Sequence, residues 1–278
     1  YTPKQKYLEY SLTIKQGEEV DLKDISTKLM NCGYERVEVV EGKGEFSFRG
    51  GILDVFPPTS AYPYRVELFG DEVDSIRTFN TESQRSIEKV EEFSIFPSKE
   101  VIVDDECRSR AVQNINEELK KVIANVSKEN KESVEKIKGI VGKNIELLNN
   151  TYYFETIDSY LPFFYEKLDS FFDYLQGYTF VVDDFKRSSG KMESIYYEFN
   201  ENYMSFLQRG DILPSQNSLL LNKGELESKL ENSSLITLSS FLNKSDGLFN
   251  TVDIGFEEVT LNKYNGQLNM LIEDIQER

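Results

Sequence analysis

The sequence predicts an α+β and α/β multidomain protein with an antiparallel β-rich domain, a helical segment and a small α/β domain. Three observations support this. Short apolar–polar alternations dominate residues 1–98, apolar residues at helical spacing follow, and compact apolar runs alternate with helical stretches after residue 165. We therefore expect units at residues 1–98, 99–164 and 165–278, with separate hydrophobic cores in the first and the last.

The first unit has the pattern of short strands joined by tight turns. An alternating run from Leu8 to Lys15 predicts a strand, and Asp21–Cys32 predicts a helix that ends before Gly33. Glycine and proline pairs separate the runs that follow, which is typical of an antiparallel meander. Strands are expected at Arg36–Val40, Glu45–Arg49, Ile52–Phe56, Tyr64–Phe69, Val73–Phe79 and Val90–Phe96.

In the second and third units the spacing of the apolar residues changes. Two apolar stripes on either side of the polar stretch Ser127–Lys131 predict a helical hairpin. The aromatic-rich segment Tyr152–Phe180 has acidic neighbours, so we interpret it as core or inter-domain packing rather than as a platform for stacking bases. A largely buried sheet is expected beyond it. Its strands are Thr179–Val182, Leu219–Leu221, Leu235–Leu238 and Val252–Phe256, with helices at Ser194–Leu207 and Lys223–Glu231.

Composition excludes several classes of function. The formal net charge of −17 opposes binding to nucleic acid or an anionic membrane and favours basic protein partners. The sequence has no histidine, the commonest acid/base group near neutral pH and the commonest metal ligand. Cys32 and Cys107 stand alone, which predicts neither a zinc site nor a disulfide framework and favours a reducing cytoplasm. No apolar run approaches the ~20 residues that span a bilayer.

Nucleotide chemistry is not predicted either, because no GxxxxGK[ST] phosphate loop is present. Gly139–Lys143 and Ser189–Lys191 resemble one superficially but lack its spacing or its leading glycine. We interpret both as ordinary helix-terminal or loop glycines. Asp183 and Asp184 follow an apolar run, where carboxylates sometimes bind Mg²⁺, but we favour a role in capping the next helix. We therefore expect no cofactor and no metal.

One strand presents an unusual combination of side chains. Arg65, Glu67 and Phe69 are spaced by two, so all three point to one face of the expected sheet. Pairing with the preceding strands can bring Arg49 alongside. A face with arginine, glutamate and phenylalanine is a poor core and a plausible docking surface. The alternative is that Phe69 belongs to the core and the arginines are ordinary surface charges; the pattern alone leaves both open.

A family resemblance covers this part of the chain, roughly residues 1–100. Its elements are Gly33–Arg36 (GYER), Phe46–Pro58 (FSFRGGILDVFPP), Pro63–Arg77 (PYRVELFGDEVDSIR) and Ser83–Ser86 (SQRS). The segment resembles the UvrA-binding domain shared by the excision repair protein UvrB and the bacterial transcription-repair coupling factors. Arg49-Gly50-Gly51 and SQRS look like the coupling factors, since UvrB usually has RGD and Leu-Thr-Gly at these places. The chain begins Tyr1-Thr2-Pro3, so we expect a piece of a longer protein.

The resemblance implies which residues contact UvrA. The family positions fall on Arg49, Arg65 and Phe69, with Glu67 also matching. Arg36 matches a UvrB contact that is less constant in the coupling factors. Ser47 departs from the pattern, because UvrB has an arginine there, so one contact is expected to be weaker or shifted.

The resemblance also implies a wider organisation. Residues 99–164 would be a returning part of the first domain, and residues 165–278 a divergent third domain. A C-terminal domain would mask the UvrA-binding surface at rest. The ATP-dependent motor, the RNA polymerase-binding domain and the contacts with DNA would lie beyond residue 278.

We therefore expect a non-catalytic, cytoplasmic adaptor that recruits UvrA to stalled RNA polymerase for nucleotide excision repair. A rival interpretation is a fragment of an ATP-dependent DNA translocase or helicase with its own nucleotide site, against which the missing phosphate loop argues. A third is a structural spacer, which we hold for residues 160–278.

Overall fold

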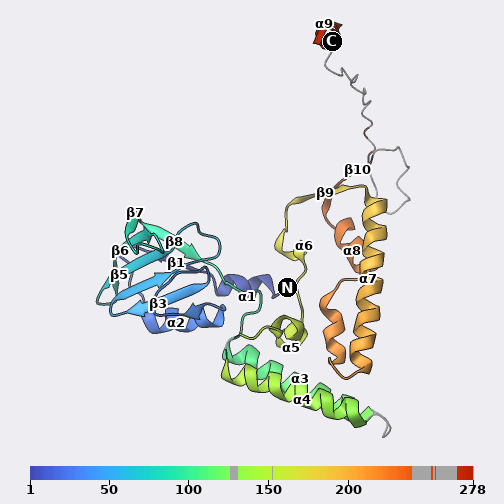
Figure 1. Ribbon diagram of the computed structural model, residues 1–278, viewed down its shortest axis with the longest axis horizontal. Coiled ribbons are helices and arrows are strands. Elements are labelled where there is room, and N and C mark those ends of the chain that lie inside the picture. Colours follow the sequence, from blue (N-terminus) through green and yellow to red (C-terminus); the bar gives the residue numbers. More distant parts are fainter. Residues whose placement is uncertain (126–130, 152, 240–251, 253, 255–267, 278) are drawn as a thin grey trace.

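The computed structural model describes residues 1–125, 131–151, 153–239, 252, 254 and 268–277. Within these residues three separate sheets are formed, so no single sheet runs through both halves of the chain. Figure 1 shows a β-rich unit at the N-terminal end, an antiparallel pair of helices, and a long helix that follows them in the sequence.

The β-rich unit is built around a six-stranded sheet in the order β2-β3-β4-β5-β6-β7 (Figure 1). Strands β3 to β7 form the expected antiparallel meander, whereas β2 joins the edge of β3 in parallel. The strands are β2 (Glu35–Arg36), β3 (Glu45–Arg49), β4 (Ile52–Val55), β5 (Tyr64–Phe69), β6 (Glu72–Phe79) and β7 (Ser86–Val90).

One face of this sheet is covered by three other elements of the unit. They are the helix α2 (Leu22–Asn31) and a separate antiparallel pair, β1 (Leu12–Lys15) with β8 (Glu92–Ile95), whereas the helix α1 (Lys4–Glu9) adds no residue to the core beneath the sheet. Helix α2 begins after Asp21, whose carboxylate accepts a hydrogen bond from the Lys23 backbone N–H at 2.8 Å. The core that results contains Ile14, Leu29, Phe46, Leu53, Val66, Ile76 and Phe93.

Several boundaries differ from the prediction. Lys4–Glu9 is a helix, so the strand expected at Leu8–Lys15 begins only at Leu12. Alternation and helical spacing cannot be told apart over so few residues. The strand expected at Arg36–Val40 ends at Arg36, and Val90–Phe96 falls on the end of β7 and on β8.

The helical segment contains the expected hairpin, α3 (Asp105–Asn125) and α4 (Lys131–Asn150), which pack side by side (Figure 1). The aromatic segment after it forms the short helices η1 (Ile157–Tyr160), α5 (Leu161–Phe164) and α6 (Phe171–Tyr174). Its interpretation as packing is confirmed for its first half, which packs against the hairpin, whereas Phe171 and Tyr178 of the second half are exposed. The buried residues of this core include Ile115, Val141, Leu148, Tyr160, Phe163 and Phe164.

The last described part does not have the buried sheet that we expected. Its elements are β9 (Thr179–Asp183), α7 (Phe185–Gln208), η2 (Pro214–Leu219), α8 (Lys223–Glu231), β10 (Ser234–Leu238) and α9 (Leu268–Glu277). Strands β9 and β10 pair in parallel as two strands, and Val181 and Ile236, which lie opposite each other, are exposed. Leu219–Leu221 is not a strand, and the expected strand at Val252–Phe256 lies largely outside the described residues.

The described residues do not form the separate core that we expected for the last unit either. Leu213 is buried, but it belongs to the core of the helical segment. The Ser215 backbone N–H donates to Glu118 of α3 at 2.7 Å, and Lys136 of α4 forms an ion pair with Asp211. This part of the chain therefore packs against the α3–α4 hairpin instead of enclosing a core of its own.

Candidate protein-docking site

The outer face of the six-stranded sheet carries charged side chains, and a small buried cluster of Val40, Phe56 and Phe79 lies beside them. The register aligns Ser47, Asp54, Arg65 and Arg77 across strands β3 to β6. Two arginines that face each other on neighbouring strands repel, so Arg65 and Arg77 need carboxylates nearby. Asp54 and Glu67 supply them, and we call this face, with Arg49 and Phe69, the docking face.

Asp54 is the centre of the docking face. Its side chain is only 1% exposed although it lies on β4 among charged neighbours. Arg65 binds it with two hydrogen bonds, Nε to Oδ1 at 2.7 Å and Nη2 to Oδ2 at 2.8 Å. Arg49 adds a third from Nη2 to Oδ2 at 3.2 Å. Two-point pairing of this kind is the strongest form of arginine–carboxylate contact, and it compensates for burying the charge.

Arg65 is held from other sides as well. Its guanidinium lies over the Phe79 ring at 4.5 Å from the centroid, and it donates to the Gln84 carbonyl and to Gln84 Oε1. Gln84 has a left-handed backbone at this contact (φ 57°). The hydrogen bonds with Asp54 raise the pKa of Arg65, so it is charged at any working pH. With 18% of its side chain exposed, Arg65 is largely an internal partner.

Glu67 lies one pleat further along β5 and is also engaged. Its Oε2 accepts from Ser75 Oγ at 2.9 Å and from Arg77 Nη2 at 3.0 Å. Both partners come from the neighbouring strand β6. Glu67 therefore fixes Arg77 on the face in the way that Asp54 fixes Arg65.

Phe69 stands at the tip of the β5–β6 hairpin. Gly70 follows it with φ +67°, a left-handed conformation that suits the tight turn. The Phe69 side chain is 86% exposed. The alternative that Phe69 is a core residue is therefore wrong, and a large apolar side chain stands in solvent beside a charged face.

Arg36 lies at the edge of the sheet, away from the Asp54 cluster. It is exposed on the short strand β2, and it lines a shallow hollow together with Ser47 and Arg49. The structure thus brings Arg49 and Arg65 together on one carboxylate, places Glu67 and Phe69 further along the same face, and puts Arg36 at its margin.

Sequence reasoning assigned no role to Asp54, Arg77 or Gln84. A signal for Asp54 was present, because a carboxylate between Leu53 and Val55 in a short strand must point to the opposite face from its apolar neighbours. Gln84 gave no such signal. Its contact with Arg65 depends on a backbone conformation that the sequence does not indicate.

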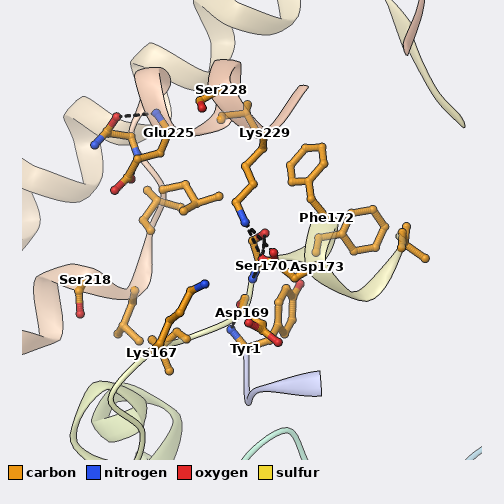
Figure 2. Close-up of a pocket in the computed structure, with 18 of the residues that line it drawn as sticks. Tyr1, Lys167, Asp169, Ser170, Phe172, Asp173, Ser218, Glu225, Ser228 and Lys229 are labelled. Atoms are coloured by element: carbon orange, nitrogen blue, oxygen red, sulfur yellow. Dashed lines mark hydrogen bonds and ion pairs between the residues drawn. The ribbon is translucent and has the colours of Figure 1, made fainter. Parts of the chain in front are cut away.

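A second hollow lies where the aromatic segment meets α8 (Figure 2). Figure 2 shows Lys229 of α8 reaching Asp173 of α6, and its Nζ lies 2.7 and 2.8 Å from the two carboxylate oxygens. Burial opposes the charged form, but the hydrogen bonds from Lys229 and Ser170 hold the pKa of Asp173 below its ordinary value. The central charges of the hollow thus stabilise each other, which is the role of a structural contact between two elements.

The other sequence candidates have structural roles. Gly139–Lys143 lies inside α4 and Ser189–Lys191 inside α7, so neither is the loop or helix-terminal segment that we expected. Asp184 caps α7 by accepting from the Arg187 backbone N–H at 3.1 Å, as predicted. Among the described residues no cluster of three or more acidic or cysteine side chains is arranged to hold a metal, and no helix has the length and apolarity to cross a membrane.

Both cysteines are unpaired and buried. Burial raises the pKa of the Cys32 thiol to about 12, and it does the same for Cys107. A thiol with so high a pKa is almost wholly protonated near neutral pH, and the thiolate is the reactive form. The cysteines therefore behave as small core residues.

Comparison with known proteins places the docking face in a recognised domain. Residues 12–101 match the family model described as the UvrB interaction domain. The transcription-repair-coupling factor of Bacillus subtilis (strain 168) is 34% identical over 203 residues, which cover 73% of this chain and 17% of that protein. Those of Staphylococcus aureus (strain MRSA252) and Staphylococcus epidermidis (strain ATCC 12228) are each 32% identical over 212 residues, 76% of this chain and 18% of theirs. The chain thus spans less than a fifth of the length of these relatives.

Proposed function

We propose, because the chain belongs to the family of transcription-repair-coupling factors, that it is a non-catalytic adaptor segment whose first domain binds UvrA. The match of residues 12–101 to the UvrB interaction domain supports the assignment of that first domain. The observation that carries the proposal is the exposed Phe69 beside an arginine that is held in place by a buried aspartate.

The chemistry of the docking face suits a protein partner. Interfaces are enriched in aromatic residues and arginine, and their strongest contacts are aromatic or arginine anchors that enter pockets. Phe69 would enter an apolar pocket of UvrA. Arg49, half of whose side chain is exposed, would meet a carboxylate beside that pocket, with Arg36 at the margin. Arg65 and Glu67 would contribute chiefly by shaping the face, because their polar atoms are already engaged within the sheet.

The similarity to transcription-repair-coupling factors supports a wider role. We propose that the longer protein recruits UvrA to stalled RNA polymerase for nucleotide excision repair in the bacterial cytoplasm. Its ATP-dependent motor and its contacts with RNA polymerase and DNA would lie in segments outside this chain, and this segment would need no cofactor. A C-terminal domain would mask the docking face at rest. Residues 165–278 would act as a structural spacer that positions its neighbours.

A binding experiment tests the proposal. Purified UvrA is immobilised, and the chain is passed over it at physiological salt, with and without UvrB as competitor. We expect the chain to be captured and UvrB to displace it, because the two would share one surface of UvrA. No capture, or capture that UvrB leaves unchanged at saturation, would contradict the proposed function.

A further inference from the structure

We infer that Asp54 is a positioning residue of the docking face: its buried carboxylate orders Arg49 so that the arginine meets UvrA in a preset direction. This inference rests on the proposed function. Asp54 is buried beneath its neighbours and would act on UvrA binding through Arg49.

The carboxylate of Asp54 accepts hydrogen bonds from two arginines, Arg49 and Arg65. Asp54 lies in β4, between the strands that carry Arg49 and Arg65, and the register places it directly opposite Arg65. Oδ1 accepts from Arg65, while Oδ2 accepts from both arginines. A carboxylate buried this deeply is unfavourable without charged partners, so the arrangement is stable only while the arginines stay on it.

The two arginines differ in how much of each side chain is exposed. Arg65 is anchored by Asp54, Phe79 and Gln84 and is mostly covered. Arg49 is 52% exposed and contacts Asp54 through Nη2, which leaves the rest of its guanidinium accessible to a partner. Arg65 thus secures the carboxylate, and the carboxylate in turn orients Arg49.

The restriction of Arg49 by Asp54 affects the affinity for UvrA. An arginine that swings freely before binding loses rotamer freedom when it is immobilised at an interface, and that loss weakens the complex. A tether that restricts Arg49 beforehand removes part of the loss. The hydrogen bond to Asp54 is such a tether, because it fixes one nitrogen of the planar guanidinium and thereby limits the direction of the others.

A positioning role for Asp54 and a purely electrostatic role of the face predict different changes in UvrA affinity for Asp54→Asn. Asp54→Asn removes a negative charge from beneath two arginines, so the docking face becomes more positive. If the face acted only through its charge, an acidic patch on UvrA would bind the variant as well as or better than the original. If Asp54 positions Arg49, the variant binds more weakly, although the amide oxygen that replaces the carboxylate could still accept a hydrogen bond from Arg65 Nε.

The experiment measures UvrA affinity for Asp54→Asn and for a matched control, Asp24→Asn. The control removes the same charge from α2, where Asp24 pairs with Lys28. We expect Asp54→Asn to bind UvrA about three- to ten-fold more weakly, and the control to bind as the original does. In an Arg49→Ala background Asp54→Asn should cause no further loss, because the residue through which it acts is gone. Unchanged or tighter binding by Asp54→Asn would overturn the inference.

A measurement on the unsubstituted chain covers the case in which Asp54→Asn fails to fold. Nitrogen-15 NMR of the arginine side chains reports how freely each guanidinium rotates. We expect restricted rotation for Arg49 and stronger restriction for Arg65; a freely rotating Arg49 would overturn the inference. Failure of the unsubstituted chain to bind UvrA would remove the proposed function instead, so the two failures are distinguishable.

Discussion

The six-stranded sheet and the two-stranded parallel sheet differ in what covers their faces. In the first, one face lies on an apolar core and the other carries the arginine–carboxylate network of the docking face. In the second, Val181 and Ile236 stand exposed on a pair of parallel strands. Parallel strands are normally buried on both faces, and two strands alone contribute little stability. The docking face thus rests on a self-sufficient scaffold, whereas β9 and β10 do not form one.

Paired core substitutions test this comparison with the largest expected effect. Phe46→Ala removes a fully buried ring from the six-stranded sheet and should cost about 3–5 kcal/mol of unfolding free energy. Ile236→Ala removes a half-exposed side chain from the parallel pair and should cost less than about 1 kcal/mol. Urea unfolding followed by circular dichroism measures both. Similar costs would show that the parallel pair has a core after all.

The two arginines of the docking face provide a sharper test. Arg65→Ala leaves Asp54 buried without its two-point partner and should destabilise the chain by about 3 kcal/mol. Arg49→Ala removes a half-exposed side chain and should cost less than about 1 kcal/mol. Thermal unfolding of the two variants is the measurement. The sequence pattern alone does not distinguish the two arginines, whereas the buried position of Asp54 sets them apart.

Particular residues show which parts of the fold the sequence pattern determines. Alternation predicted the strands β3, β5 and β6 closely and put Arg65, Glu67 and Phe69 on one face, because period two leaves little choice once one face is apolar. The helix α2 was predicted from its apolar stripe and the glycine that follows it. The partners of Arg65 were not, since they depend on cross-strand register and on the backbone of Gln84. Apolar runs without alternation, such as Leu219–Leu221, did not reveal whether a strand forms.

The joint between the β-rich unit and the helical segment should respond to acid. Asp104 pairs with Lys6 of α1 at 2.5 Å and accepts from Tyr10 and from the Cys107 backbone N–H. Burial alone would raise the pKa of Asp104, but these hydrogen bonds hold it at about 2, below the ordinary 3.8. The folded-state pKa is thus the lower one, so this stabilisation is complete only above about pH 4 and is lost as the pH falls from there through about 2.

The matching measurement is thermal unfolding as a function of pH for the original chain and for Asp104→Asn. The shift corresponds to about 2 kcal/mol at neutral pH, and the variant should lose that much stability there. Between about pH 4 and pH 2 its stability should fall less steeply than that of the original. Parallel pH curves would show that Asp104 does not secure this joint.

The smallest expected effect is an absence of binding. With a net charge of −17, the chain should not bind duplex DNA more tightly than about 1 µM at physiological salt, because such affinity depends on cationic neutralisation of phosphates. Arg49, Arg65 and Arg77 of the docking face each pair with a carboxylate, which lowers the positive charge that the face offers to phosphates. A mobility-shift titration measures it, and a retarded band at sub-micromolar protein would indicate a basic surface that the two sheets do not show.

If the outer face of the six-stranded sheet docks UvrA, Phe69→Ala should weaken UvrA binding without unfolding the chain. UvrA affinity and thermal unfolding are measured together, with Leu8→Ala as a control that removes another exposed apolar side chain from α1. We predict that Phe69→Ala leaves unfolding within about 0.5 kcal/mol of the original and weakens UvrA binding by about ten-fold or more, while Leu8→Ala changes neither. Unchanged UvrA affinity in a folded Phe69→Ala variant would contradict the account.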